Sequence, residues 1–134
     1  MTAQDIPEGI RWFYRSVGEE IARIGAENSR SGATKEELSE PSCIASGVRW
    51  RNNHYAELRA LASIAIEAEV ALKHRGLASA KQVLTEKTQS GPVRTMLDTP
   101  AAQPLRDTIA AATGNRANRE QFMLFVNTMG QIVS

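Results

Sequence analysis

The chain has 134 residues, of which 42% are hydrophobic and 23% are charged, with 16 Lys and Arg against 15 Asp and Glu. This length suits one domain, and the near-neutral balance excludes an acidic mimic of DNA and a polybasic arm. No run of 18 apolar residues occurs, and Asp5, Glu8 and Arg11 interrupt the first segment early, so we expect neither a membrane span nor a secretion signal.

The first predicted element is an amphipathic helix that ends near Glu27. Asp5 and Glu8 have the spacing of a capping box, and Pro7 suits a first turn. Gly18 and Gly25 lie beside the apolar stripe, where each costs about 1 kcal/mol relative to alanine, so we expect a second helix to pack closely there. Apolar side chains recur at steps of three and four at Ile10, Tyr14, Val17, Ile21 and Ile24.

A short helix and then a long central helix are predicted next. Thr34 and Glu37 form another capping-box pattern, which predicts a helix over 35–40 that Pro41 closes. The long helix covers about 47–75 and ends where Lys73, His74 and Arg75 precede Gly76. Its apolar arc exceeds half the circumference, so we place it at the centre of a bundle.

The sequence of the last third of the chain predicts three more helices and a short turn. Helices are expected over 79–90, from Thr99 to Gly114, and from Asn118 or Asn115 to about Gln131, with a turn at 92–98. The predicted fold is therefore all-α, a single domain over 1–134 with four or five principal helices around the 47–75 helix.

Several large apolar side chains lie off the main helical stripes. Trp12, Phe13 and Trp50 are of this kind, and Met123 and Leu124 make the last helix apolar on more than one face. Exposed tryptophans anchor many interfaces, although burial in the core explains these residues equally well. Our leading hypothesis is a small non-catalytic interaction module that docks another protein or a second copy of itself, with a homodimer as one form.

The alternative hypothesis is a nucleic-acid-binding regulator that uses a helix-turn-helix-like segment over 34–59. Arginine and asparagine form paired hydrogen bonds with guanine and adenine. The linker over 41–46 exceeds the usual turn, and the net charge lacks a phosphate-binding excess, so a solvated surface is favoured. The candidate residues are Arg49, Arg51, Asn52 and Asn53, with Arg116 and Arg119 at the start of the last helix.

Metal, cofactor and catalytic signatures are weak in this sequence. The two histidines, His54 and His74, stand apart from Cys43, and neither follows a glutamate by three residues, so we expect no metal and no cofactor. The single cysteine excludes an intrachain disulfide and favours a cytoplasmic location. A helical enzyme is the third hypothesis, and it needs Glu69 or His54 to meet arginines from another helix, although Lys73 offers Glu69 a simple ion pair.

Overall fold

The computed structural model describes residues 2–29 and 32–134, and within these ranges its regular secondary structure consists of helices with no strand, which confirms the all-α class. Short 3-10 helices occupy Ala3–Asp5, Glu8–Ile10 and Pro100–Ala102. The α-helices are α1 (Arg11–Ser29), α2 (Glu40–Asn53), α3 (Tyr55–Arg75), α4 (Leu77–Lys87), α5 (Gly91–Leu97), α6 (Gln103–Thr113) and α7 (Arg119–Val133).

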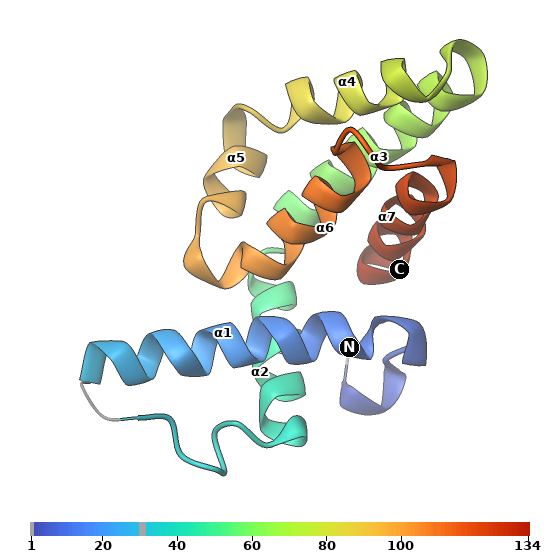
Figure 1. Ribbon diagram of the computed structural model, residues 1–134. Coiled ribbons are helices and arrows are strands. Elements are labelled where there is room, and N and C mark those ends of the chain that lie inside the picture. Colours follow the sequence, from blue (N-terminus) through green and yellow to red (C-terminus); the bar gives the residue numbers. More distant parts are fainter. Residues whose placement is uncertain (1, 30–31) are drawn as a thin grey trace.

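The helices surround one hydrophobic core (Figure 1). Helices α1 and α2 cross in the lower half of that view, while α4 and α7 both pack against α3. The largest fully buried side chains are Tyr14, Phe13, Phe122, Phe125, Ile10, Leu58, Leu61, Leu84, Leu105, Met129, Ile132 and Val17. No helix in the described ranges has both the length and the apolarity needed to cross a membrane.

The predicted helix over 47–75 is in fact two helices, which meet at His54. The backbone of His54 has φ −115° and ψ 22°, and its N–H donates to Trp50 O at 3.0 Å while its carbonyl accepts from Leu58 N at 2.9 Å. Nδ1 of His54 also lies 3.0 Å from Trp50 O, so the side chain shares the carbonyl that accepts the backbone N–H of His54. This break lets α2 leave the line of α3 and cross α1.

The prediction of a short helix over 35–40 is also wrong. The two capping bonds do form: Glu37 N donates to Thr34 Oγ1 at 3.1 Å, and Thr34 N donates to Glu37 Oε1 at 3.4 Å. The residues between them adopt turns and not a helix. Ser39 caps α2, and Pro41 lies in the first turn of that helix, where its missing N–H costs nothing. Residues 34–59 therefore hold turns, α2 and the start of α3, and do not form a helix-turn-helix.

Helix α1 begins at Arg11, later than its sequence pattern indicates. The capping box at the N-terminus joins Thr2 to Asp5, through bonds of 2.9 and 3.3 Å, and Pro7 precedes the second 3-10 helix. Two later signals are confirmed. Asn118 and Gln121 cap α7 reciprocally at 2.9 Å, and α3 ends at Arg75 before Gly76, whose φ is +95°.

Two glycines bring the backbones of α1 and α2 into direct contact. A Cβ atom at Gly18 would lie 1.9 Å from the carbonyl oxygen of Cys43, and one at Gly47 would lie 2.1 Å from that of Tyr14. The contact is reciprocal, because each helix has a glycine that faces a backbone carbonyl group of the other helix. The expected close packing is confirmed at Gly18 but not at Gly25, where nothing lies within 4 Å.

Alanine substitutions at these glycines should separate into two classes. We expect Gly18→Ala and Gly47→Ala each to lower the free energy of unfolding by about 3 kcal/mol or more, because the added methyl group meets backbone and the helices must move apart. Gly25→Ala should raise it by about 1 kcal/mol through helix propensity alone. Urea unfolding followed by circular dichroism measures all three, and equal effects would contradict the close crossing.

The same crossing holds two buried ionisable groups. Burial raises the pKa of the Cys43 thiol, with a further contribution from Glu19, and burial also raises the pKa of Tyr14, opposed by the nearby charge of Arg51. Within the described ranges, the hydroxyl of Tyr14 has no hydrogen-bond partner. An unpartnered buried hydroxyl costs about 1–3 kcal/mol, so Tyr14→Phe should leave stability unchanged or increase it.

Alkaline pH should weaken the crossing. Both folded-state pKa values exceed the ordinary values of 9.0 and 10.0, so the unfolded chain loses these protons first. The contribution of these groups is fully present at neutral pH and falls as pH rises past about 9. Urea titrations from about pH 8 to about pH 11 should show this fall, smaller in Tyr14→Phe than in the parent chain. An equal fall in both proteins would contradict the role of Tyr14.

Candidate functional site

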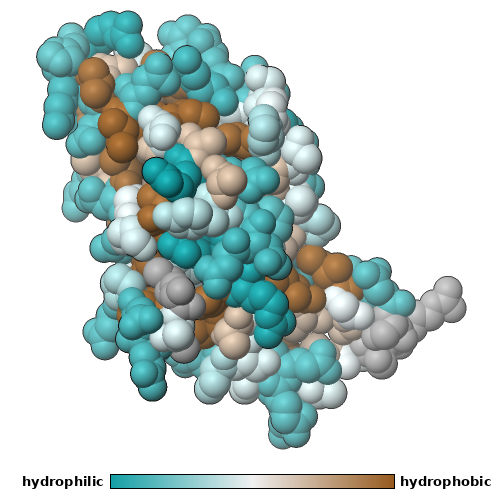
Figure 2. All heavy atoms as spheres, turned by 180° about the vertical axis from the view of Figure 1, so that it is seen from behind, coloured by the Kyte–Doolittle hydropathy of each residue, from teal (hydrophilic) through white to brown (hydrophobic). Residues whose placement is uncertain are grey.

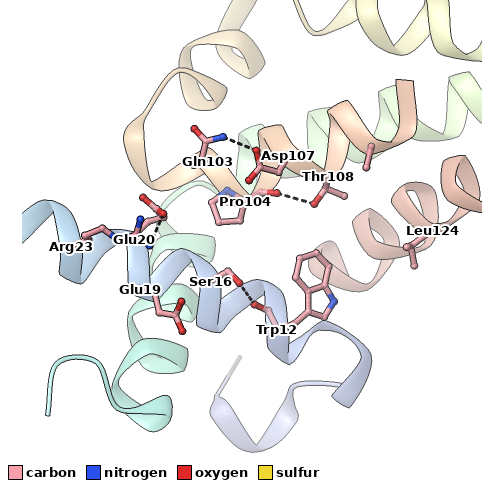
Figure 3. A pocket seen from close by; sticks show the side chains of 11 residues that line it. Trp12, Ser16, Glu19, Glu20, Arg23, Gln103, Pro104, Asp107, Thr108 and Leu124 are labelled. Carbon is pink, nitrogen blue, oxygen red and sulfur yellow. Dashed lines mark hydrogen bonds and ion pairs between the residues drawn. The ribbon is translucent and has the colours of Figure 1, made fainter. Parts of the chain in front are cut away.

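A groove of about 450 Å³ opens between α1, α6 and α7 (Figure 3). Its apolar parts include Trp12 on α1, Pro104 on α6 and Leu124 on α7, so three segments distant in sequence form one concave surface. The full lining consists of Trp12, Ser16, Glu19, Glu20, Arg23, Gln103, Pro104, Asp107, Thr108, Ala111 and Leu124.

Two exposed apolar side chains line this groove. Trp12 is 37% exposed and Leu124 is 62% exposed. The indole N–H of Trp12 donates to Gly9 O at 2.9 Å, and its ring meets Phe13 edge-on with the centroids 6.0 Å apart. In Figure 3 the indole points from α1 toward α7. Because its polar atom is already bonded, the ring is oriented in advance and loses little freedom when a partner covers it.

The polar lining of the groove is predominantly acidic. The charged residues of the lining are Glu19, Glu20, Asp107 and Arg23, so three negative charges and one positive charge give it a net charge of −2. Glu20 pairs with Arg23 at 3.0 Å, and Glu19 lies 3.8 Å from Arg15 outside the lining. Asp107 instead accepts from the neutral amide of Gln103 at 2.7 Å, so its charge stays available to an incoming cation.

Of the five residues predicted to bind a partner, some line the groove and others lie in the core. Trp12 and Leu124 line the groove, and Met123 is partly buried against the core. Phe13 and Trp50 are 0% and 6% exposed, so they offer no surface to a partner and belong to the core. The imidazole of His54 stacks on the indole of Trp50 with the ring centroids 4.7 Å apart.

Arg51, a predicted nucleic-acid contact, is a structural residue. It is 9% exposed, its Nε donates to Ile132 O at 2.9 Å and its Nη2 lies 3.4 Å from Ser134 O. The guanidinium lies 4.4 Å from the ring centroid of Tyr55, whose hydroxyl donates to Val133 O at 2.8 Å. The pair satisfies carbonyl groups at the C-terminal end of α7, where the helix dipole favours a cation.

The remaining predicted nucleic-acid contacts are exposed but fall into two separate groups. Arg49, Asn52 and Asn53 lie near the end of α2, which Arg51 ties to the end of α7. Arg119 is the first residue of α7, and Arg116 lies in the turn before it. The 15 residues of α7 span about 22 Å, so the structure does not bring the two groups together.

The residues considered for catalysis also lie apart. Glu69 pairs with Lys73 at 3.7 Å, as the spacing suggested. His54 and Glu57 line a different groove of about 410 Å³ with Pro92, Thr95, Met96 and Thr99, and no arginine contributes to that lining. Among the described residues, no three His, Cys, Asp or Glu side chains are grouped so that they could hold a metal ion.

Comparison with protein-family models, with curated proteins and with solved structures finds no match for this chain. The groove itself is the main feature that the sequence did not reveal. Gln103 and Asp107 join Trp12 only because α6 packs beside α1 in the folded chain, and no local pattern encodes that pairing.

The different roles of Arg51 and Arg49 can be tested by measuring the free energy of unfolding of their alanine variants. Arg51→Ala should lower the free energy of unfolding by about 2–3 kcal/mol, because buried carbonyl groups at the end of α7 lose a charged donor. Arg49→Ala, at an exposed position in the same helix, should change it by less than about 0.5 kcal/mol. Urea unfolding of both variants gives the comparison, and a loss below about 0.5 kcal/mol for Arg51→Ala would contradict the capping role.

Proposed function

We propose that this protein is a small non-catalytic interaction module that docks a segment of another polypeptide in the groove between α1, α6 and α7. The observation that carries the proposal is the exposure of Trp12 and Leu124 in one concave, acidic surface. We also propose a cytoplasmic location, because the single cysteine is a buried free thiol.

The energetics of the groove fit a docking role. Covering a leucine side chain completely stabilises a complex by about 1.5–3 kcal/mol, and tryptophan is the residue type most enriched among interface anchors. Two such anchors alone give a weak complex once the entropy cost of association is included. Glu19 and Asp107 on the rim add charge complementarity, which selects a partner with a basic residue beside its apolar side chain.

The groove can be tested by photo-crosslinking in cells that produce the protein. Benzoylphenylalanine is placed at Ala111, which lines the groove and is exposed, and at Thr85 on α4 as a matched exposed control. We expect an adduct of defined mass from position 111 and none from position 85. The substitution Leu124→Lys should abolish the adduct, because it removes one anchor and places a cation where a basic partner would bind.

Three outcomes would contradict the proposal. The first is the absence of an adduct from position 111, and the second is the same adduct from position 85. The third is an adduct that persists unchanged in the Leu124→Lys background. Because Leu124 is 62% exposed, this variant should keep the circular dichroism spectrum and unfolding midpoint of the parent protein, which separates loss of docking from loss of fold.

A further inference from the structure

A second exposed apolar surface lies on α3. Ile66 is 60% exposed and Val70 is 51% exposed, one helical turn apart on the same face. Arg59 and Lys73, each seven residues from Ile66, lie on this face as well, so two cations flank the apolar centre. We call these four residues, Arg59, Ile66, Val70 and Lys73, the α3 stripe.

The charges of the α3 stripe are available to a partner. Among the described residues Arg59 forms no ion pair with a carboxylate. Its guanidinium carbon lies 5.9 Å from the centroid of the Tyr55 ring. Lys73 pairs with Glu69 at 3.7 Å, but its side chain is 68% exposed, and exposed pairs of this kind are weak. The stripe therefore presents one unpaired and one weakly paired cation beside two aliphatic side chains.

The α3 stripe and the groove face different directions. Helix α3 lies behind α6 in Figure 1, and the view from behind in Figure 2 shows apolar surface interrupting the hydrophilic atoms. No residue of α3 lines the groove. The two surfaces thus cannot satisfy each other within one molecule, and both stay accessible in the monomer.

We infer that the α3 stripe of one copy docks in the groove of a second copy. This inference rests on the proposed docking function and names a second copy of the chain as the occupant. The two surfaces are complementary in chemistry, because Ile66 and Val70 match the apolar anchors Trp12 and Leu124. The charges also match, because in the described part of the chain neither Arg59 nor Asp107 forms an ion pair, and Asp107 accepts from the neutral amide of Gln103.

Such a contact joins two different surfaces and is therefore heterologous. A pair formed in this way keeps one unused groove on one copy and one unused stripe on the other, so association continues into a ring or an open chain instead of stopping at a two-fold dimer. An exposed helix seated in a groove between helices is a common recognition mode, in which side chains one turn apart act as anchors.

Complementation between two variants tests the inference. Leu124→Lys blocks the groove and leaves the stripe intact, whereas Ile66→Glu blocks the stripe and leaves the groove intact. In sedimentation velocity from about 10 μM to about 1 mM, we expect the mass of the parent protein to rise and each variant to remain monomeric. An equimolar mixture should form a dimer and stop there, because only one intact groove and one intact stripe can meet.

A charge exchange tests the specific pair. Arg59→Asp and Asp107→Arg should each weaken self-association at least tenfold, and the double variant should recover most of it because the opposite charges are restored. Thr85→Lys and Thr85→Glu, at an exposed position on α4 outside both surfaces, are the matched controls and should associate like the parent protein.

A parent protein that stays monomeric at about 1 mM would overturn the inference. So would a mixture of the blocked variants that stays monomeric, or a blocked variant that still associates alone. These failures differ from failure of the proposed function. A groove adduct to another protein at position 111, together with a monomeric parent, would leave docking intact and remove only the second copy as its occupant.

Discussion

The direct backbone contact between α1 and α2 is the constraint on which the rest of this structure depends. Gly18 and Gly47 each leave space for a carbonyl group of the opposite helix, so the relative position of the helices has almost no freedom. This contact directs Tyr14 toward α2. It leaves the row Trp12, Ser16, Glu20 and Arg23, spaced by four and three residues, on the side where α6 packs. The crossing therefore positions the α1 residues that form one side of the groove.

The opposite wall depends on the joint between α2 and α3. The bend at His54 brings Arg51 and Tyr55 to the C-terminal end of α7, where they satisfy the carbonyl groups of Ile132 and Val133. Helix α7 carries Leu124 on its exposed side and begins at the Asn118 capping box, which is local to the first turn of that helix. The bonds from Arg51 and Tyr55 at its C-terminal end therefore help to orient the helix that completes the docking surface.

Local features of this fold were predictable from the sequence, because capping and helix termination depend on neighbouring residues. The Asn118 cap, the end of α3 at Gly76 and the close approach at Gly18 are examples. The break at His54 was not predictable, because the apolar periodicity continues across it and the side-chain contact with Trp50 O is visible only in three dimensions.

The candidate site was only partly predictable, for a related physical reason. A helical wheel shows which side chains leave the main stripe, but it does not show what covers them. Trp12 and Leu124 remained exposed, whereas Phe13 and Trp50 were covered once α2 had folded back onto α1. The acidic character of the groove needs Asp107 from α6, which begins 74 residues after the end of α1, and charge counting along the chain could not assemble it.

The most direct measurement of the α1–α2 crossing is a nuclear Overhauser spectrum of the labelled protein. The account predicts strong cross-peaks between the Hα protons of Gly18 and Cys43 and between those of Gly47 and Tyr14, because ordinary side-chain packing never brings helical backbones so close. A spectrum in which these glycines show contacts only within their own helices would contradict the crossing and the groove built upon it.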